Sequence, residues 1–397
     1  MLRLYNSLTR KKEKFVPLEG KKVRMYVCGI TPYDTTHLGH AFTYIFFDTF
    51  ARYLKFRGYE VNYTQNVTDI DDDILKRAKK EKKDWKVLGN FWTAKYLSDM
   101  KILNVLSPTH YVKATDSITL MIYIIKVLID KGFAYQKNGN VYFDIKTFKD
   151  YGHLSGFNEK QMKILLKERG GNPNDKLKKN PLDFLLWKKS APGEPFWKTP
   201  WGNGRPGWHI ECSAMIKDFL GDQIDIHGGG RDLIFPHHES VIAQSESFTR
   251  QKPFVKFWMH TSMVLYQGEK MSKSLGNLVM ISDLLRLYKP NEIRWLLLSH
   301  HYRKPWEFDE NELAQCKKAI KIINKALKIK SRGRTKIDVY RYRSMFDSFM
   351  DDDVNTPKTL LLLVNMAERI IHEKEISNTL DFQDVLLRHL LTLGFVF

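Results

Sequence analysis

Two histidines and a carboxylate stand side by side in the stretch IFPHHESVIAQ, residues 234–244 of this 397-residue chain. Helical side chains share a face only when they lie about one turn apart, and the residue four positions after His237 is Val241. Thiols occur far away in the sequence, at Cys28 and Cys212. Two thiolates and an imidazole suit zinc, although a single cysteine is more often a small buried apolar residue.

The motif HLGH, residues 37–40, lies between an expected strand and an expected helix. A helix N-terminus favours phosphate through its free N–H groups, Gly39 permits close approach of the backbone, and imidazoles donate hydrogen bonds to phosphate oxygens. The motif KMSKS, Lys270–Ser274, adds two lysines three residues apart. Such lysines can neutralise the charge that develops as pyrophosphate leaves, although an exposed polar loop is an equal alternative. Chance seldom produces the two motifs together.

These motifs need a scaffold that brings distant segments together. Lys21–Gly29 predicts a buried strand, Ala41–Gly58 a helix with apolar residues at helical spacing, and Tyr59–Asp69 a second strand. A strand, a helix and a strand in this order form a βαβ unit, with parallel strands and a right-handed crossover. Ligands bind beyond the carboxyl ends of such strands, which is where Cys28 and Thr68 lie.

Other stretches have structural interpretations. Residues 134–145 predict a β-hairpin, and the apolar run Ile118–Ile129 predicts a buried helix rather than a membrane span. The stretch from the hairpin to about residue 195 is rich in Lys, Gly and Pro, which indicates an insertion between two halves of the sheet domain. The chain after Ser282 is predicted to be helical. The acidic runs Asp69–Asp73 and Asp351–Asp353 are interpreted as helix-start or loop features rather than as metal sites.

The composition restricts the class of protein. Hydrophobic residues make up 43% of the chain and aromatic residues 13%, which is ample for a globular fold. The N-terminus has no apolar signal segment, and three cysteines do not indicate a disulfide framework, so we expect a reducing cytoplasm. The net charge of +19 favours a polyanionic partner, with a Lys-rich compositional bias as the alternative.

HLGH and KMSKS together resemble the signature of class I aminoacyl-tRNA synthetases. With MYVCGITPYD, NVTDIDD, NPLDFLLWK, GRPGWHIECSAM and IHGGGRDLIFPHHE, the chain resembles cysteinyl-tRNA synthetases from its N-terminus to about residue 365. The resemblance implies an α/β fold with a Rossmann-like catalytic domain in residues 1–105 and 197–262, split by a connective insertion in residues 106–196. It also implies a KMSKS-loop stem-contact region in residues 263–305 and an α-helical C-terminal domain in residues 306–397, with no separate anticodon domain.

The resemblance implies that ATP, with Mg²⁺, activates L-cysteine as cysteinyl-adenylate before its transfer to tRNA. One zinc ion per chain, bound by Cys28, Cys212 and His237, would take the substrate thiol as a ligand, because zinc binds sulfur far better than a serine hydroxyl. A monomer that binds no membrane is expected. The residues that would bind cysteine and the adenylate are Cys28, Gly29, Thr31, Thr43, Asn66, Thr68, Trp208, Gly230, Asp232 and Val264. Those that would stabilise the pentacoordinate phosphorus are His37, His40, Lys270 and Lys273.

Two features depart from the family pattern. The position four residues after His237 normally carries a glutamate as the fourth zinc ligand, and here it is Val241. Glu239 would point roughly 200° away on a helix, and His238 is expected to line the site or to pack, so we expect an open fourth position. The chain also ends soon after NMAERIIHEK, before any segment that could form an anticodon-reading domain.

Both departures, with ITPYDTTHLGHA, KERGGNPNDK and YQGEKMSKS, resemble a related family, the cysteine ligase of mycothiol biosynthesis. That enzyme transfers cysteine from the same adenylate to the amine of glucosaminyl-inositol. The charge of +19 and the basic stretch Lys317–Arg343 favour tRNA, because an amino sugar requires neither. The chain is also rich in Lys, Ile and Phe, unlike proteins of GC-rich mycothiol producers. We expect tRNA as the acceptor, with the amino sugar as the alternative.

Two other enzyme classes explain fewer of the motifs. A nucleotidyltransferase would not need the two cysteines, and a zinc hydrolase would not need KMSKS.

Overall fold

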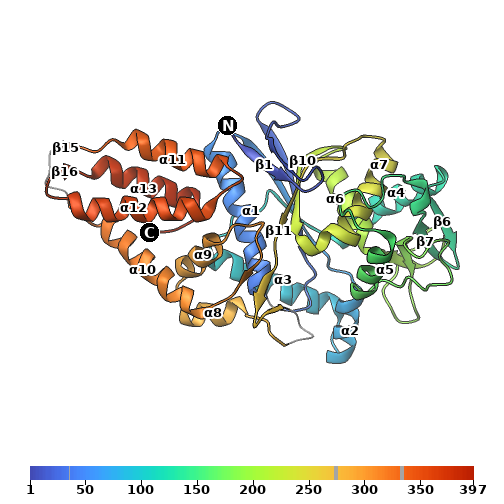
Figure 1. Ribbon diagram of the computed structural model, residues 1–397. Helices are drawn as coiled ribbons and strands as arrows, with labels where there is room; N and C mark the ends of the chain where they lie inside the picture. Colours follow the sequence, from blue (N-terminus) through green and yellow to red (C-terminus); the bar gives the residue numbers. More distant parts are fainter. Residues whose placement is uncertain (35, 272–275, 331–334) are drawn as a thin grey trace.

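The computed structural model describes residues 1–34, 36–271, 276–330 and 335–397 (Figure 1). In this part of the chain a central parallel sheet has five strands in the order β11-β10-β3-β4-β5. The strands are β3 (Lys22–Ile30), β4 (Glu60–Val67), β5 (His110–Lys113), β10 (Ile224–Gly230) and β11 (Val255–Thr261). The predicted βαβ unit is confirmed, because α1 (Leu38–Phe56) connects β3 to its parallel neighbour β4.

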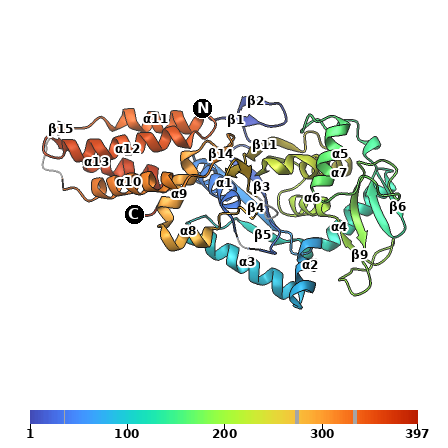
Figure 2. The ribbon, with the colours of Figure 1, turned by 60° about the horizontal axis from the view of Figure 1, so that its bottom comes forward.

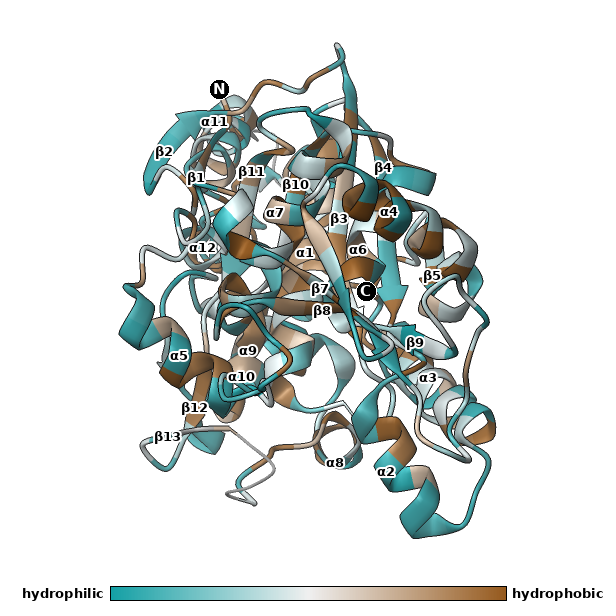
Figure 3. Cartoon of the chain, turned by 90° about the vertical axis from the view of Figure 1, so that its right-hand side faces the viewer, coloured by the Kyte–Doolittle hydropathy of each residue, from teal (hydrophilic) through white to brown (hydrophobic). Residues whose placement is uncertain are grey.

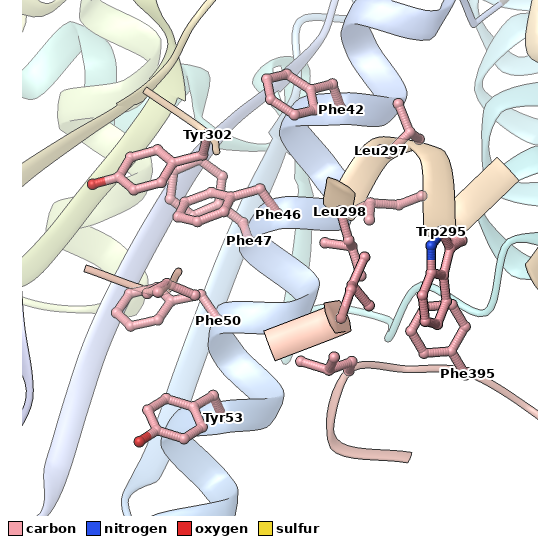
Figure 4. Packing of buried hydrophobic residues seen from close by; sticks show 14 of the residues in the cluster. Phe42, Phe46, Phe47, Phe50, Tyr53, Trp295, Leu297, Leu298, Tyr302 and Phe395 are labelled. Atoms are coloured by element: carbon pink, nitrogen blue, oxygen red, sulfur yellow. The ribbon is translucent and has the colours of Figure 1, made fainter. Parts of the chain in front are cut away.

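Helix α1 carries the largest share of the aromatic core. Its first turn is capped by His37, whose Nδ1 accepts a hydrogen bond from the backbone N–H of His40. Figure 4 shows Phe42, Phe46 and Phe50 along the helix, and the ring of Phe46 stacks on Tyr302 at a centroid distance of 4.0 Å. This packing also includes α9 (Pro290–Ser299). The buried contacts fix the axis of α1, and thereby the place of its N-terminus beside the sheet.

The range predicted as an insertion contains three of the four strands of a second sheet. β6 (Ala134–Lys137) and β7 (Asn140–Phe143) form the predicted hairpin, which continues antiparallel into β8 (Phe184–Lys189) and β9 (Gly204–Pro206). The predicted buried helix is α4 (Ile118–Asp130), and the short helices of this region are η1 (Ala114–Ser117), η2 (Ile145–Thr147) and α5 (Glu159–Glu168). β5 lies past the boundary that we placed at residue 105, yet it pairs with β4. The central sheet therefore extends into the range assigned to the insertion.

The second half of the sheet domain surrounds β10 and β11. Its helical segments are α6 (Trp208–Phe219), η3 (Arg231–Leu233), η4 (Ile234–His238) and α7 (Glu239–Thr249). It continues into the hairpin of β12 (Val264–Tyr266) and β13 (Glu269–Lys270), and then into α8 (Ile281–Leu287). At the other edge of the sheet, α2 (Asp72–Glu81) and α3 (Trp85–Ile102) join β4 to β5.

The C-terminal part is helical, as predicted. Its helices α10 to α13 lie at the end of the molecule opposite the β6–β9 sheet (Figures 1 and 2). They are α10 (Glu310–Leu327), α11 (Val339–Asp351), α12 (Thr356–Glu373) and α13 (Leu380–Thr392), accompanied by the short strands β14 (Trp306–Glu307), β15 (Thr335–Lys336) and β16 (Ser377–Asn378). At the N-terminus, β1 (Arg3–Asn6) pairs with β2 (Lys11–Lys14).

The two acidic runs differ in structure. Asp71 caps α2 by accepting a hydrogen bond from the backbone N–H of Asp73, which confirms the helix-start interpretation. The second run instead ends α11, and Asp353 is fully buried. Its carboxylate accepts hydrogen bonds from the Tyr302 hydroxyl at 2.8 Å and the Arg303 guanidinium at 2.6 Å. Asp353 therefore joins the helical region to the segment that follows α9.

The hydropathy pattern fits this layered arrangement. In Figure 3 hydrophobic residues concentrate on the central strands and on α4, whereas β2 and the outer turns of α2 are hydrophilic. Within the described ranges, no helix has both the length and the apolar character needed to cross a membrane.

Candidate active site

A cavity of about 700 Å³ opens at the carboxyl ends of β3 and β10. It brings together residues that the sequence places far apart. The predicted site residues that line it are Cys28, Gly29, Thr31, His37, His40, Thr43, Trp208, Gly230, Asp232 and Val264. The lining also includes residues that the sequence analysis did not select, among them Tyr33, Asp34, Glu168 and Ser262. Tyr33 and Asp34 lie in MYVCGITPYD and Glu168 lies in KERGGNPNDK, so those motifs could have indicated them, whereas Ser262 lies in none of the motifs.

The two histidines of HLGH occupy one end of the cavity. Their rings stack with a centroid distance of 3.7 Å and an interplanar angle of 23°. His37 caps α1 and His40 lies in its first turn, where backbone N–H groups and the helix dipole favour an anion. Farther along this wall, the Thr43 hydroxyl lies 2.7 Å from that of Thr261 at the end of β11. This end presents imidazoles and hydroxyls, which suit phosphate and ribose oxygens.

The segment that follows KMSKS is attached to the same end. The backbone N–H of Leu38 donates to the carbonyl of Val279 at 2.8 Å, and that of Ile281 donates to the carbonyl of Thr36 at 2.9 Å. Lys270 lies in β13, and nothing is described of its side chain. Lys273 lies outside the described residues. The roles of both lysines therefore stay predictions, while the segment that follows the motif lies beside HLGH.

Asn66 and Thr68 stand behind the wall of the cavity and support it. The Asn66 side-chain oxygen accepts a hydrogen bond from the Gly29 N–H at 2.8 Å, and a Cβ atom on Gly29 would overlap the Asn66 carbonyl oxygen. The Thr68 hydroxyl donates to the Glu211 carboxylate at 2.7 Å. Glu211 is buried, and burial raises its pKa well above the usual value. These residues position the strand ends, which is a different contact from the direct binding that the sequence analysis assigned to them.

A cluster of sulfur and nitrogen atoms adjoins the cavity at Cys28, which lines it, while Cys212 and His237 are buried next to that thiol. The Cys28 and Cys212 Sγ atoms are 3.8 Å apart, and the Cys212 Sγ lies 3.2 Å from the His237 Nε2. The other His237 nitrogen, Nδ1, lies 3.0 Å from the His209 Nδ1, and the Trp208 ring stacks on His237 at 4.4 Å. The three predicted ligands, contributed by β3, α6 and η4, therefore converge although 209 positions separate the first from the last.

The cluster has the chemistry of a zinc site. A tetrahedral zinc ion with Zn–S bonds of about 2.3 Å separates two sulfur ligands by about 3.8 Å, which matches the distance between the two thiols. Burial raises the pKa of Cys28, and its hydrogen bond with Cys212 adds to the rise. Burial acts in the same direction on Cys212, but its hydrogen bond with Cys28 and the nearby His237 outweigh burial and lower the pKa of that thiol. The residues present thus fit zinc.

The residues that follow His237 in the sequence have different surroundings. Glu239 turns towards the insertion, where its carboxylate accepts hydrogen bonds from the backbone N–H groups of Leu154 and Ser155, each at 3.0 Å. Val241 is fully buried in the core. His238, which we expected to line the site or pack, places its Nε2 3.3 Å from the Cys28 Sγ. Ligand atoms of Cys28, His237 and His238 all lie within 4.8 Å of one another.

The comparisons with known proteins agree with this geometry. The family described as tRNA synthetases class I (C) catalytic domain matches residues 14–318. A cysteine--tRNA ligase of Thermococcus onnurineus (strain NA1) is 46% identical over 384 residues, which are 93% of this chain and 80% of the relative. The chain belongs to the cysteinyl-tRNA synthetase family. A further relative in the family, a cysteine--tRNA ligase of Legionella pneumophila (strain Corby), is 47% identical over 388 residues, covering 96% of this chain and 82% of the relative.

Solved structures of other class I synthetases share the fold. Methionyl-tRNA synthetase of Mycobacterium tuberculosis, in complex with methionyl-adenylate, has a TM-score of 0.68 at 13% identity. The match covers 94% of this chain and 89% of that one. The ternary complex of Agrobacterium radiobacter K84 agnB2 LeuRS with tRNA and LeuAMS has a TM-score of 0.69 at 11% identity, covering 96% and 84%. At these identities the similarity establishes the class I synthetase fold.

Proposed function

We propose that the chain activates L-cysteine with ATP, releases pyrophosphate and transfers the cysteinyl group from the adenylate to tRNA. The observation that carries the proposal is a single cavity lined both by the stacked His37 and His40 and by Cys28, whose thiol belongs to the Cys28–Cys212–His237 cluster. Two relatives that are 46% and 47% identical are named cysteine--tRNA ligases, which supports the same substrates.

In the first step the cysteine carboxylate attacks the α-phosphate of ATP. A bond forms between a carboxylate oxygen and the α-phosphorus, the α–β phosphoanhydride bond breaks, and pyrophosphate leaves with the electron pair. His37 and His40 donate hydrogen bonds to oxygens whose charge grows in this step, and the N-terminus of α1 adds its dipole. Lys270 and Lys273 would neutralise the departing pyrophosphate, and Mg²⁺ accompanies ATP. Positioning and charge stabilisation thus account for the step, with no covalent enzyme intermediate.

The thiol of the substrate is selected at the opposite end. Cys28, Cys212 and His237 would hold one zinc ion per chain, which when bound favours a thiolate over a serine hydroxyl. Trp208 stacks on His237, lines the cavity and would pack against the substrate side chain. Thr43, Gly230, Asp232 and Val264 line the cavity and would contact the adenosine part. The separation of the two ends lets the thiol be recognised without interfering with the phosphates.

In the second step a terminal ribose hydroxyl of tRNA attacks the carbonyl carbon of the adenylate, and AMP leaves. The charge of +19 supports a polyanionic acceptor, because Lys and Arg side chains release counterions from the phosphate backbone. We further propose that the enzyme is a cytoplasmic monomer.

Cysteine-dependent exchange of label between pyrophosphate and ATP tests the first step. Metal-replete protein should catalyse exchange with cysteine and little exchange with serine, and absence of exchange would refute cysteine activation. The second step is tested by offering the preformed adenylate complex either tRNA or glucosaminyl-inositol. Formation of cysteinyl-tRNA supports the proposal, whereas transfer to the amino sugar alone would overturn the acceptor.

A further inference from the structure

The thiol–imidazole cluster has a further nitrogen in reach. Two thiols and His237 supply three zinc ligands, and Val241, one helical turn after His237, has no ligand atom to offer. The His238 Nε2 lies 3.3 Å from the Cys28 Sγ. His238 is fully buried, as is Val241. We propose that His238 is the fourth protein ligand, so that the zinc site is Cys₂His₂ rather than Cys₂His with an open position.

The spacing of the atoms supports this ligand set. Tetrahedral zinc with Zn–S bonds of about 2.3 Å and Zn–N bonds of about 2.0 Å separates a sulfur from a nitrogen ligand by about 3.5 Å. The Cys28–His238 contact at 3.3 Å and the Cys212–His237 contact at 3.2 Å are both close to that value. The ligand atoms of Cys28, His237 and His238 also lie within 4.8 Å of one another. Cys212 is not part of that group, although its Sγ lies 3.8 Å from the Cys28 Sγ and 3.2 Å from the His237 Nε2, so side chains would have to move for one ion to bind all four residues.

The second nitrogen of His238 has the partner that a ligating histidine needs. Its Nδ1 lies 2.8 Å from the His260 Nε2, and the His260 Nδ1 lies 2.8 Å from the Ser7 hydroxyl. A ligating histidine donates its other N–H to a fixed acceptor, which sets the tautomer and the ring orientation. Donation from His260 to Ser7 and from His238 to His260 leaves a lone pair on the His238 Nε2. The opposite direction would make that Nε2 a donor to a Cys28 thiolate, which is the competing arrangement.

His227 on β10 provides a matched comparison. It is fully buried like His238, and its Nε2 lies 3.5 Å from the same Cys28 Sγ. Its Nδ1 has no hydrogen-bond partner among the described residues, so nothing comparable to the His238–His260–Ser7 chain orients it. Among the described side chains, His238, unlike His227, forms a group of mutually close ligand atoms with Cys28 and His237. His227 therefore controls for the loss of a buried imidazole beside Cys28.

Zinc K-edge X-ray absorption on the wild-type protein, loaded with one zinc and free of cysteine, tests the ligand set directly. We expect two sulfur and two nitrogen neighbours, with outer-shell scattering from two imidazoles. Two sulfurs with scattering from a single imidazole would overturn the proposal. This measurement needs no substitution, so it remains decisive if a variant fails to fold.

Substitutions give a second, independent test. In competition with a chromophoric chelator, His238→Ala should bind zinc at least about 100-fold more weakly, more than the loss of a residue that only orients a ligand. The visible spectrum of its Co²⁺ form should also change. His227→Ala should keep the wild-type spectrum. Adding Val241→Glu to His238→Ala should restore affinity, because it places a carboxylate one turn from His237.

Unchanged affinity and an unchanged Co²⁺ spectrum in His238→Ala would overturn the proposal. The inference rests on the zinc site of the proposed function, but metal binding is measured without ATP or tRNA. If the ligand set is wrong, wild-type protein can still show cysteine-dependent exchange. If cysteine activation is wrong, the absorption spectrum still reports the four ligands.

Discussion

Two regions that adjoin the cavity are built differently: the thiol end, a cluster that reaches the cavity at Cys28, and the phosphate end around His37 and His40. At the thiol end, Cys28, Cys212, His237 and His238 are at most 6% exposed and contact one another through their side chains. At the phosphate end, His37 and His40 are partly exposed, and main-chain hydrogen bonds attach the segment that follows KMSKS to the first turn of α1. One end is a rigid side-chain cluster, and the other is a surface formed by a helix terminus and loop backbone.

The difference corresponds to the two tasks of the enzyme. Choosing a thiol over a hydroxyl requires fixed ligand geometry in a site that excludes water, so burial is an advantage there. Stabilising a phosphate whose charge changes during the reaction requires donors that can also release pyrophosphate, so partial exposure is an advantage. The two ends should therefore respond separately to substitution.

Cys28→Ser should have the largest effect, because it should disrupt the zinc site at the thiol end. A hydroxyl is a poor replacement for a thiolate, so we expect nearly all bound zinc to be lost. Cysteine-dependent exchange should fall by at least about 10³-fold, because several kcal/mol of stabilisation disappear. Zinc content and exchange are measured on the same preparation. Cys316→Ser, which changes the cysteine of α10, should retain zinc, and a full zinc equivalent in Cys28→Ser would refute the ligand assignment.

His37→Asn should weaken the stabilisation of the phosphates and leave the zinc site unchanged. Asparagine retains an acceptor that can cap α1, so the helix is preserved while the imidazole is removed. We expect the exchange rate to fall by about 10²- to 10³-fold, as for the loss of one donor to a developing charge. Zinc content should equal that of the wild type. A coupled loss of zinc would show that the two ends are not independent.

Asn66→Ala tests the wall between the two ends. Without the amide, the Gly29 N–H loses its acceptor, which costs about 1–2 kcal/mol when that group is buried. The KM for cysteine should rise by about 5- to 30-fold, because Gly29 adjoins Cys28. Asn62→Ala, on the same strand β4 but hydrogen-bonded to Phe219, serves as the control. Equal changes in both variants would indicate a general weakening of β4 instead.

Thr43→Val should have the smallest effect of the four substitutions. It tests the part of the cavity that would contact the adenosine of ATP. Loss of its hydroxyl contact with Thr261 removes one hydrogen bond worth about 1 kcal/mol. The KM for ATP should rise by about fivefold, with no change in zinc content or in the KM for cysteine. Thr49→Val, on the same helix but bonded to Leu393, should leave both KM values unchanged. A larger change in the KM for cysteine than for ATP would place Thr43 at the wrong end.

Local patterns were sufficient for several of the elements, and the family resemblance indicated much of the site lining. The βαβ unit, the hairpin of residues 134–145 and the helical C-terminal part all follow from periodicity and turn residues. The domain boundary predicted at residue 105 excludes β5 from the sheet domain, although β5 pairs with β4. A strand this short is recognised by its parallel partner rather than by its own sequence. Asp353 looked like a loop residue, and its burial depends on Tyr302 and Arg303.

The sequence by itself determined the motifs, their placement at strand and helix ends, and the kinds of atoms available to bind zinc and phosphate. These are local properties, set by residue type and by the period of each element. Tertiary structure alone decided which atoms meet. Asn66 and Thr68 lie behind the cavity wall, where they hydrogen-bond to Gly29 and Glu211. Glu239 hydrogen-bonds to the insertion, and His238 lies beside Cys28. The reason is that such contacts depend on how strands and helices distant in the chain pack, and a single sequence pattern does not specify that packing.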